Sequence, residues 1–417
     1  MYTDKITDYF DGVAAKYLSA VDADPARSNG HEIGGLPSAG ARNWLGIPSK
    51  GEVFRYPALH VYLADDQDEP LICDSEVTWY DARSKQPGRS PEYRMYYEDS
   101  PVTMRFKPGD FFLVAKHRDG RLLMCFSPQK SAAEKQLRAI FGLSVIDEDF
   151  RQGDLNASTL LLPLRLMLES LGFNLSKPAL DDGAWLDRLL AQFGDKDFPR
   201  TDAFSMFARD SIGNEIDAIA SPDTTLMAWM EHEEKLFRIY ERYFVLRRLA
   251  IGFGIDEKGV DAFISYSLSV QNRRKSRVGH AFEGHLGHLF QKHDLQFEKG
   301  TKVLVTENNT RPDFLFPSFM AYHDASFPTE RLLMLGAKTT CKDRWRQVLS
   351  EASRIPAKHL VTLEPAISEA QTDEMKNHQL QLVVPRSLHS TFSERQQSQL
   401  LDVAEFISLV KINQKAR

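Results

Sequence analysis

The sequence predicts two domains: a mainly-β domain over residues 1–175 and an α/β domain over residues 203–417, joined by a linker at residues 176–202. Three observations carry this prediction. The chain of 417 residues is longer than one hydrophobic core usually serves. Its first part contains short runs rich in aromatic and β-branched residues, separated by turn-forming residues. Its second part alternates helical and strand-like patterns, which indicates a central mixed sheet flanked by helices.

The amino-terminal strand candidates are short and closely spaced, a pattern typical of a closed or nearly closed barrel. They cover residues 53–63, 76–80, 93–97, 102–106, 111–115 and 122–126. A helix is expected over residues 131–141, because apolar residues recur there at helical spacing. The linker is placed where turn-forming and charged residues replace these patterns.

The carboxyl-terminal domain begins with helical periodicity and continues with strands. Helices are expected over residues 227–251, 260–270, 281–293 and 343–355. Strands are expected at residues 302–306, 313–316, 331–338, 359–363 and 380–384. Because a helix lies between two of these strands, the pattern favours a layered α/β architecture.

Composition limits the classes of function only in part. The formal net charge of −6 argues against a protein that binds nucleic acid through overall positive charge, as histones do. It still allows an enzyme whose basic residues gather in one cleft. The longest apolar runs are too short for a membrane span, and the three cysteines lack metal-binding spacing. We therefore expect a protein of the reduced cytoplasm with no membrane partner.

Two residues at predicted strand ends are suited to phosphodiester hydrolysis. Asp313 directly follows Pro312 and opens one strand, and Lys338 closes the next. Hydrolysis needs an activated water and neutralisation of charge in the transition state. One or two Mg²⁺ ions held by carboxylates supply both, and a lysine beside the metal orients or deprotonates the water. Taken singly, such residues are more often a turn signal and a solvated charge.

A second metal-binding carboxylate is expected from outside the strands. The common nuclease pattern places Asp or Glu two positions before the lysine, but Gly336 occupies that position. Glu351 is the substitute, at the margin of the helix that follows Lys338, and with Asp313 it would hold the metal. Glu283 is a further carboxylate, close to the apolar stripe of its own helix. The alternative for each glutamate is an ordinary surface charge on a helix.

A basic cluster lies just before the helix of Glu283. It holds four cations, Arg273, Arg274, Lys275 and Arg277. They are suited to clamping phosphates, and arginine also reads guanine in the major groove. The alternative is a solvated helix start. Histidines at positions 280, 285, 288 and 293 follow, but no other convincing ligand set accompanies them, which argues against zinc.

The triplet Lys342, Asp343 and Arg344 lies a few residues from the candidate metal site. Lysine or arginine pairs with guanine and aspartate accepts from cytosine, so the triplet is suited to reading G·C pairs. Its alternative role is a helix cap by Asp343 between surface charges. Tyr322 is expected either to touch phosphate or to pack.

The first half contains a loop whose charges are candidate DNA contacts. Arg89, Glu92 and Arg94 are suited to base edges and Lys85 to phosphate. Exposed charge on a hairpin is an equally good interpretation. His31, in a turn-like stretch, is a further candidate for a DNA contact.

These stretches together resemble the EcoRII family of type II restriction endonucleases. The resemblance is carried by residues 272–277, 311–318, 321–324, 338–347 and 382–389. It covers the chain after residue 200. Over the first 170 residues it is looser, and it rests there on the order of the strands and on the neighbourhoods of His31 and of Arg89 to Arg94.

The resemblance implies a Mg²⁺-dependent homodimer that cuts duplex DNA at short palindromes of the CC-N-GG type, with A or T at the centre in some members. The carboxyl-terminal domain would then have a restriction-endonuclease-like fold. Its catalytic positions would be filled by Asp313, Lys338 and Glu351, with Glu283 and Tyr322 in support.

The family also implies roles for the remaining candidates. The triplet at residues 342–344 falls where the family reads its G·C pairs. The amino-terminal domain would be a DNA-binding pseudobarrel, an effector domain that binds a second copy of the target and otherwise masks the catalytic cleft. A cytosine methyltransferase is expected as the genetic partner.

Two other functions remain open at this point. A nuclease that requires modified bases would use the amino-terminal domain for methylcytosine. A DNA-binding regulator or recombination factor would keep the folds without hydrolysing DNA. A missing catalytic residue would indicate the regulator, but Asp313, Lys338 and Glu351 are all present.

Overall fold

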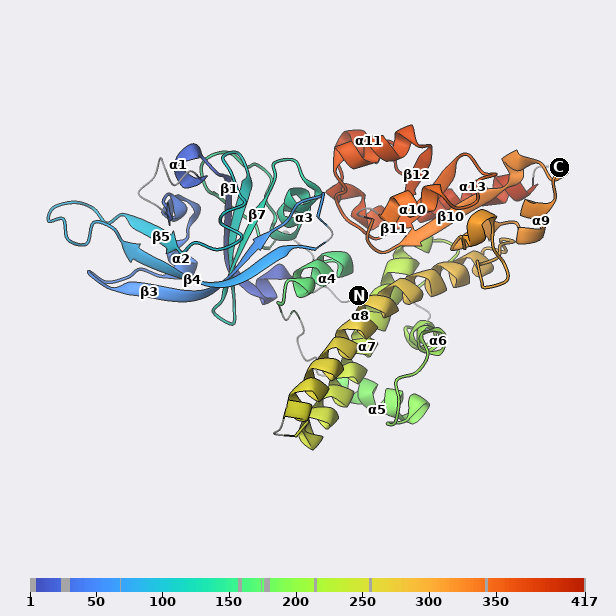
Figure 1. Ribbon diagram of the computed structural model, residues 1–417, viewed down its shortest axis with the longest axis horizontal. Coiled ribbons are helices and arrows are strands. Elements are labelled where there is room, and N and C mark those ends of the chain that lie inside the picture. Colours follow the sequence, from blue (N-terminus) through green and yellow to red (C-terminus); the bar gives the residue numbers. More distant parts are fainter. Residues whose placement is uncertain are drawn as a thin grey trace. The chain divides into compact units, whose positions relative to one another are not determined.

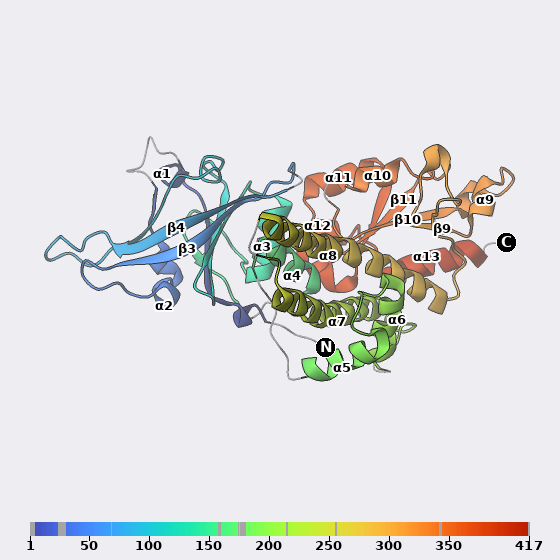
Figure 2. The same cartoon turned by 60° about the horizontal axis from the view of Figure 1, so that its bottom comes forward.

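The computed structural model describes residues 5–415, except residues 24–30, 68, 157–159, 174, 176–180, 214–215, 255–256 and 342–343. Contacts between Cα atoms divide the chain into two compact units. The amino-terminal unit comprises Tyr2–Leu175 with Pro365–Ala370, and the carboxyl-terminal unit comprises Ser176–Glu364 with Gln371–Arg417. Figures 1 and 2 show the elements of each unit.

The amino-terminal unit is built on an eight-stranded sheet in the order β2-β5-β4-β3-β7-β6-β1-β8. β3 and β7 pair in parallel, and the other neighbours pair antiparallel. Among the described residues no pairing joins β2 to β8, so hydrogen bonds do not close the expected barrel. The strands are β1 (Phe10–Tyr17), β2 (Glu32–Ile33), β3 (Val53–Tyr62), β4 (Leu71–Asp81), β5 (Tyr93–Tyr97), β6 (Phe111–His117), β7 (Leu122–Ser127) and β8 (Arg151–Gln152).

Two features of this sheet differ from the sequence-based expectation. β1 was not expected, because its small residues give little strand signal, yet it pairs on both sides, with β6 and β8. The strand expected at residues 102–106 is wrong. Ser100 N donates to Thr103 Oγ1 at 2.7 Å, and Thr103 Oγ1 donates to Ser100 O at 3.0 Å. These side-chain bonds favour a turn over strand pairing.

The sheet buries apolar residues on both of its faces. Along β6, Phe111 and Phe112 belong to two different apolar clusters, as the alternation of side chains in a strand requires. The first cluster also contains residues of the predicted helix at 131–141, which begins after the capping residue Ser131. The helices of this unit are α1 (Ala20–Ala23), α2 (Arg42–Leu45), α3 (Ala132–Phe141) and α4 (Leu162–Ser170).

The carboxyl-terminal unit has a four-stranded mixed sheet in the order β12-β11-β10-β9. β9 runs antiparallel to β10, whereas β10, β11 and β12 are parallel, so the predicted mixed sheet is confirmed. The strand expected at residues 302–306 is wrong: Thr301 Oγ1 accepts bonds from Val303 N and Leu304 N, which folds the chain there. The strands are β9 (Phe314–Phe316), β10 (Leu333–Lys338), β11 (Lys358–Thr362) and β12 (Leu380–Val383).

A long helical hairpin also belongs to this unit (Figures 1 and 2). α7 (Pro222–Ile251) and α8 (Glu257–Lys292) lie side by side, and α5 (Asp182–Phe193) and α6 (Thr201–Ser211) pack against them. α8 is one helix where two were expected, so the basic cluster lies within it. α5 and the start of α6 fall inside the expected linker, which is therefore not a simple connection.

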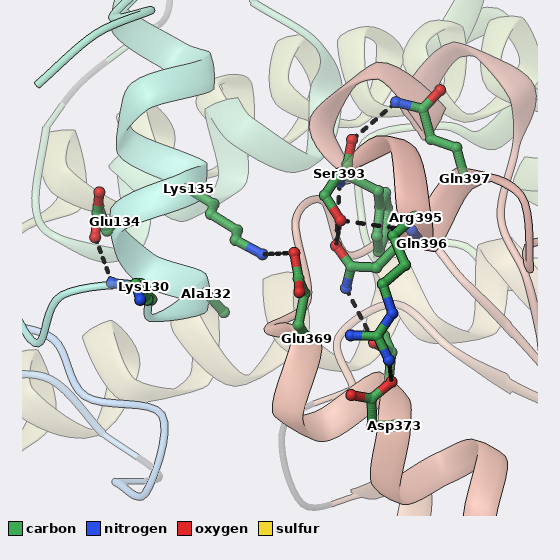
Figure 3. Close-up of polar contacts among 12 residues, drawn as sticks. Lys130, Ala132, Glu134, Lys135, Glu369, Asp373, Ser393, Arg395, Gln396 and Gln397 are labelled. Carbon is green, nitrogen blue, oxygen red and sulfur yellow. Dashed lines mark hydrogen bonds and ion pairs between the residues drawn. The ribbon is translucent and has the colours of Figure 1, made fainter.

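The remaining helices of this unit are short, apart from the last. α10 is shorter than the helix predicted over residues 343–355. α12 begins with a capping box between Ser393 and Gln396, and Arg395 Nη2 lies 2.7 Å from Asp373 Oδ1 on α11 (Figure 3). In the part of the chain that is described, no helix is long and apolar enough to span a membrane. The helices are α9 (Phe319–His323), α10 (Trp345–Leu349), α11 (Glu369–Asn377), α12 (Glu394–Gln397) and α13 (Val403–Lys415).

Candidate active site

Asp313 and Lys338 meet at one end of the carboxyl-terminal sheet. Because β9 and β10 are antiparallel, with Phe314 paired to Leu335, the residue before β9 reaches the last residues of β10. Asp313 Oδ2 accepts hydrogen bonds from Ala337 N and from Lys338 Nζ, both at 2.7 Å. The two charged side chains are 15% and 18% exposed, so solvent screens this ion pair only in part.

Gly336 explains why this strand carries no carboxylate two positions before the lysine. Val348 on α10 packs over Gly336, and a Cβ atom at Gly336 would lie 2.8 Å from Val348 Cγ2. That distance is shorter than van der Waals contact, so a side chain at this position would displace α10. The second carboxylate must therefore come from another segment.

Glu351 lies in the turn after α10, not at the margin of a helix as predicted. The left-handed backbone of Ala352, with a φ of 47°, turns the chain away at this point. Glu351 Oε2 is buried and has no hydrogen-bond partner among the described residues. Burial and the carboxylate of Asp313 raise the pKa of Glu351 to about 8, although Lys338 opposes this. The structure thus brings Glu351 to the Asp313–Lys338 pair.

Tyr322 on α9 holds the turn that carries Glu351. Its hydroxyl lies 2.7 and 2.6 Å from the two carboxylate oxygens of Glu307, to which it donates, and it accepts from Arg354 N at 3.2 Å. Glu307 Oε2 also accepts from Ser353 N at 3.2 Å. Tyr322 is buried. Of its two expected roles, this geometry favours packing and support of the turn.

Glu283 approaches the same cluster from α8, and Lys299 accompanies it. Burial raises the pKa of Glu283, and the carboxylate of Asp313 raises it further. Lys299 Nζ donates to the backbone oxygen of Glu283 at 2.9 Å and lies 4.9 Å from the centre of the Phe314 ring. Burial lowers the pKa of Lys299, whereas Glu283 and Asp313 oppose this effect. A second ammonium group thus lies among the carboxylates.

Sequence reasoning missed Lys299, because its segment has neither a helical nor a strand pattern. Glu298 forms an isolated antiparallel bridge with Leu315, and Gly300 N donates to Pro312 O at 2.9 Å. A Cβ atom at Gly300 would lie 2.7 Å from Pro312 O, so only glycine permits this approach. The glycine next to Lys299 was the one signal in the sequence for a close contact.

Arg277, a candidate DNA contact, belongs instead to a buried ion pair. Its Nη2 lies 2.6 Å from Glu233 Oε1 on α7, and its guanidinium stands over the Phe204 ring at 4.1 Å from the ring centre. The side chains of Arg277 and Glu233 are only 5% and 3% exposed. In this structure Arg277 therefore links α8 to α7, and its side chain is not accessible to a partner.

The other cations of the basic cluster lie at or near the surface of α8. Arg274 Nη2 lies 2.5 Å from Glu241 Oε2 on α7, and the guanidinium of Arg273 lies 5.0 Å from the centre of the Phe198 ring. Lys275 is exposed, and none of the described residues forms an ion pair with it. Within this cluster, Lys275 is the cation that a partner could reach most easily.

Lys342 and Asp343 of the candidate G·C-reading triplet lie outside the described residues. Arg344 is described, and it is exposed directly before the first residue of α10. Its side chain therefore has access to solvent on the segment that leads from Lys338 towards Glu351.

The loop candidates of the amino-terminal unit differ in their surroundings. Lys85 and Arg89 are exposed. Arg94 lies between two acids, with Nη1 2.6 Å from Glu32 Oε2 and Nη2 2.6 Å from Glu92 Oε1. Glu92 and Arg94 therefore compensate one another's charge, whereas Lys85 and Arg89 remain accessible.

His31 has a constrained backbone next to the strand β2. Its φ is 64°, a left-handed value that costs energy for a residue with a side chain. Its Nε2 lies 3.6 Å from Asp99 Oδ1, and its ring stands edge-on to Tyr97 at 5.5 Å between ring centres. These contacts hold His31 half-buried beside β5.

A family model described as EcoRII C terminal matches residues 237–407, a range that contains Glu283, Asp313, Lys338 and Glu351. Residues 237–407 are therefore similar to the carboxyl-terminal domain of EcoRII. The Type II restriction enzyme EcoRII of Escherichia coli is 46% identical over 187 residues. This confirms the resemblance to the EcoRII family in the carboxyl-terminal part and supports a restriction-endonuclease-like fold there. The match covers 45% of this chain and 45% of that enzyme, so it spans less than half of the relative's length.

Solved structures align with this chain at lower similarity. Metal-depleted Ecl18kI in complex with uncleaved DNA is 18% identical with a TM-score of 0.43, and the alignment covers 56% of this chain and 85% of that chain. The complex of the restriction endonuclease PspGI with substrate DNA is 16% identical with a TM-score of 0.41, covering 52% and 93% of the two chains.

Proposed function

We propose that this protein is a type II restriction endonuclease that hydrolyses phosphodiesters of duplex DNA in a metal-dependent reaction. One observation carries the proposal. Asp313 and Lys338 form an ion pair at 2.7 Å, beside a buried Glu351 oxygen that lacks a partner among the described residues. All three residues lie in the region that the EcoRII C-terminal family model matches, which supports the proposal.

The residues present fit a hard divalent cation such as Mg²⁺, which prefers oxygen ligands. Glu351 Oε2 and the carboxylate of Asp313 would hold it, and both hydrogen bonds described for Asp313 end on Oδ2. Among the described residues no group of three or more His, Cys, Asp or Glu side chains is placed to hold a metal alone. Water and phosphate oxygens would therefore complete the site. When bound, the cation supplies charge neutralisation and lowers the pKa of its water.

The chain's own groups have separate tasks in this proposal. The ammonium group of Lys338, held by Asp313 at 2.7 Å, orients the attacking water and adds positive charge beside the phosphate. Glu283 and Lys299 lie near this pair. Lys299 holds the backbone of α8 through its hydrogen bond to Glu283 O. Tyr322 keeps the turn of Glu351 in place through Glu307.

The finer features of the proposal come from the EcoRII resemblance. They are a CC-N-GG type palindrome read in part by Lys342, Asp343 and Arg344, Mg²⁺ as the metal, a homodimer, and a cytosine methyltransferase as genetic partner. The amino-terminal unit would bind a second copy of the site, with the exposed Lys85 and Arg89 as its accessible loop cations. The exposure of Arg344 supports its role in base reading.

Digestion of a plasmid with and without Mg²⁺ tests the proposal, and sequencing of the ends gives the site and cut position. Asp313→Ala and Lys338→Ala should each abolish cleavage while gel-shift binding to the same DNA persists. Lys376→Ala, an exposed lysine at the end of α11, is the matched control and should cut normally. Cleavage by both site variants would contradict the assignment.

The same assay separates the two other functions. Cleavage restricted to methylated plasmid would indicate a nuclease that requires modified bases. Sequence-specific binding without cleavage, under every metal tested, would indicate a DNA-binding regulator. Cleavage of unmethylated plasmid and its loss on methylation would support the restriction enzyme.

A further inference from the structure

The backbone after Glu351 is held by side chains of other segments. Most backbone N–H groups of a folded protein donate to backbone carbonyls in helices and sheets. Three successive N–H groups after Glu351 donate to side chains instead: Ala352 N to Thr306 Oγ1 at 3.3 Å, Ser353 N to Glu307 Oε2 at 3.2 Å, and Arg354 N to the Tyr322 hydroxyl at 3.2 Å. We call residues 351–355 the Glu351 turn. Its conformation therefore depends on contacts between distant segments.

Arg354 adds a second connection through its side chain. The guanidinium donates to four backbone carbonyl oxygens at the end of α9 and just beyond it, those of Ala321, Tyr322, Asp324 and Phe327. The distance from Nη1 to Asp324 O is 2.7 Å. The last carbonyls of a helix have no partner within the helix, so an arginine there can satisfy several of them. Arg354 thus ties the Glu351 turn to α9 through both its backbone and its side chain.

These contacts occupy the donors that Arg354 would need for DNA. A guanidinium donates from three nitrogens. Nη1 and Nη2 donate to the four carbonyls, and Nε donates to Thr329 Oγ1 at 3.4 Å. Every nitrogen of the group therefore has a partner within the protein. A phosphate contact would have to break several of these bonds.

The contacts of Arg354 act on a carboxylate in an unfavourable environment. Burial and the carboxylate of Asp313 raise the pKa of Glu351 to about 8. Before a cation binds, the charged forms of the two acids repel each other, and a loose turn would let Glu351 move away. A ligand that is fixed beforehand binds a metal more tightly than one that must be ordered on binding.

We propose that Arg354 is the positioning residue for Glu351: it holds the Glu351 turn against α9, so that the carboxylate stays where a divalent cation binds. This role rests on the proposed metal site, and it adds a residue that acts through the turn without touching the metal or DNA. Lysine would not replace this arginine, because one ammonium group cannot reach four carbonyls spread over residues 321–327.

Binding of Mn²⁺ to the full chain without DNA, followed by electron paramagnetic resonance, tests this role. Mn²⁺ takes the same oxygen ligands as Mg²⁺. Arg354→Met should weaken Mn²⁺ binding by about 10–100-fold, the usual effect of removing a group that orients a metal ligand. Arg354→Lys, which keeps the charge and is the milder change for folding, should restore little of the affinity. Circular dichroism and thermal unfolding check that each variant is folded.

Arg138→Met is the matched control. Arg138 also donates to backbone carbonyls that follow a helix, those of Leu143, at 3.2 Å, and of Ser144. Its loss should lower the stability of the protein but leave Mn²⁺ binding unchanged, because Arg138 belongs to the amino-terminal unit.

A double-mutant cycle separates positioning from a general loss of stability. In the Glu351→Gln protein the carboxylate is absent, so adding Arg354→Met should change Mn²⁺ binding by less than about twofold. Normal Mn²⁺ binding by Arg354→Met and Arg354→Lys, or an equal loss with and without the Glu351 carboxylate, would overturn the proposal. So would weaker DNA binding with normal Mn²⁺ binding, which would indicate a phosphate contact. If Glu351→Gln alone bound Mn²⁺ normally, the proposed metal site would fail, and this role with it.

Discussion

Replacing Glu351 by glutamine should make the metal-free protein more stable at high pH. Burial and the Asp313 carboxylate raise the pKa of this group to about 8 in the folded chain, from an ordinary value of 4.5. The folded state thus holds the proton more tightly than the unfolded state does. This carboxyl therefore lowers the stability of the protein as pH rises from 4.5 to 8. At about 1.4 kcal/mol for each unit of pH, the loss has an upper limit of about 5 kcal/mol.

Urea unfolding in the presence of a chelator measures this effect. At about pH 5 the Glu351→Gln variant and the unmodified protein should differ little, because the carboxyl is protonated in the folded state. At about pH 9 the variant should be more stable, by up to about 5 kcal/mol, since the amide never ionises. Glu330→Gln, at an exposed position, is the control and should show no such pH dependence. A difference that is the same at both pH values would refute the reasoning.

Mg²⁺ should reduce the difference in stability between the two proteins at high pH. A ligand that binds only the folded state stabilises it by about 2.7 kcal/mol at a concentration one hundred times its Kd. The unmodified protein should gain this amount, whereas the Glu351→Gln variant, with a weaker ligand in place of the carboxylate, should gain much less. An equal gain in both proteins would show that Glu351 does not bind the metal.

Three further variants test the packing around the site, each by thermal or urea unfolding. Gly336→Ala should destabilise by about 1–3 kcal/mol through its clash with Val348, and Val348→Ala in the same chain should relieve part of the loss; simple additivity would argue against that contact. Arg277→Met should cost up to about 3–5 kcal/mol, because it leaves the buried Glu233 carboxylate with His285, 2.9 Å away, as its remaining charged neighbour. A cost within the range of surface substitutions would mean that the pair is not buried. Lys299→Met should destabilise by about 1.5–3 kcal/mol at neutral pH, and Mg²⁺ should restore part of the loss by replacing the missing positive charge. Equal losses with and without Mg²⁺ would contradict this role.

The pair at the strand ends could be predicted because its positions follow from local pattern alone. Asp313 and Lys338 adjoin short apolar strands with clear limits, and antiparallel pairing of those strands brings their ends together. Because Gly336 cannot supply a carboxylate, Glu351 was predicted to replace it. The structure brings Glu351 close enough to Asp313 for the two carboxylates to interact.

What the sequence could not predict depends on contacts between distant segments. The turn at Glu351 is fixed by Glu307 and Tyr322, which come from other elements, so a continuous helix was expected there. Lys299 enters the site because Gly300 approaches Pro312, a contact with no periodic pattern.

The basic cluster shows a different limit of sequence reasoning. Four cations within six residues indicated a surface that binds phosphates. They lie on a helix, however, where successive side chains point in different directions. Arg277 thereby turns inward to Glu233, while Lys275 points outward. The acid that neutralises Arg277 lies on α7, far away in sequence, and only the packed hairpin reveals it.

The shortness of α10 has a consequence for how the rate of cleavage would depend on the DNA sequence. This single turn of helix begins directly after Arg344 and ends two residues before Glu351. Because the helix is so short, a small tilt at its amino-terminal end also displaces its carboxyl-terminal end. With the proposed role of Arg344 in base reading, a mismatched base pair there would displace Glu351 at the other end of α10, so a near-cognate duplex should slow cleavage more than it weakens binding.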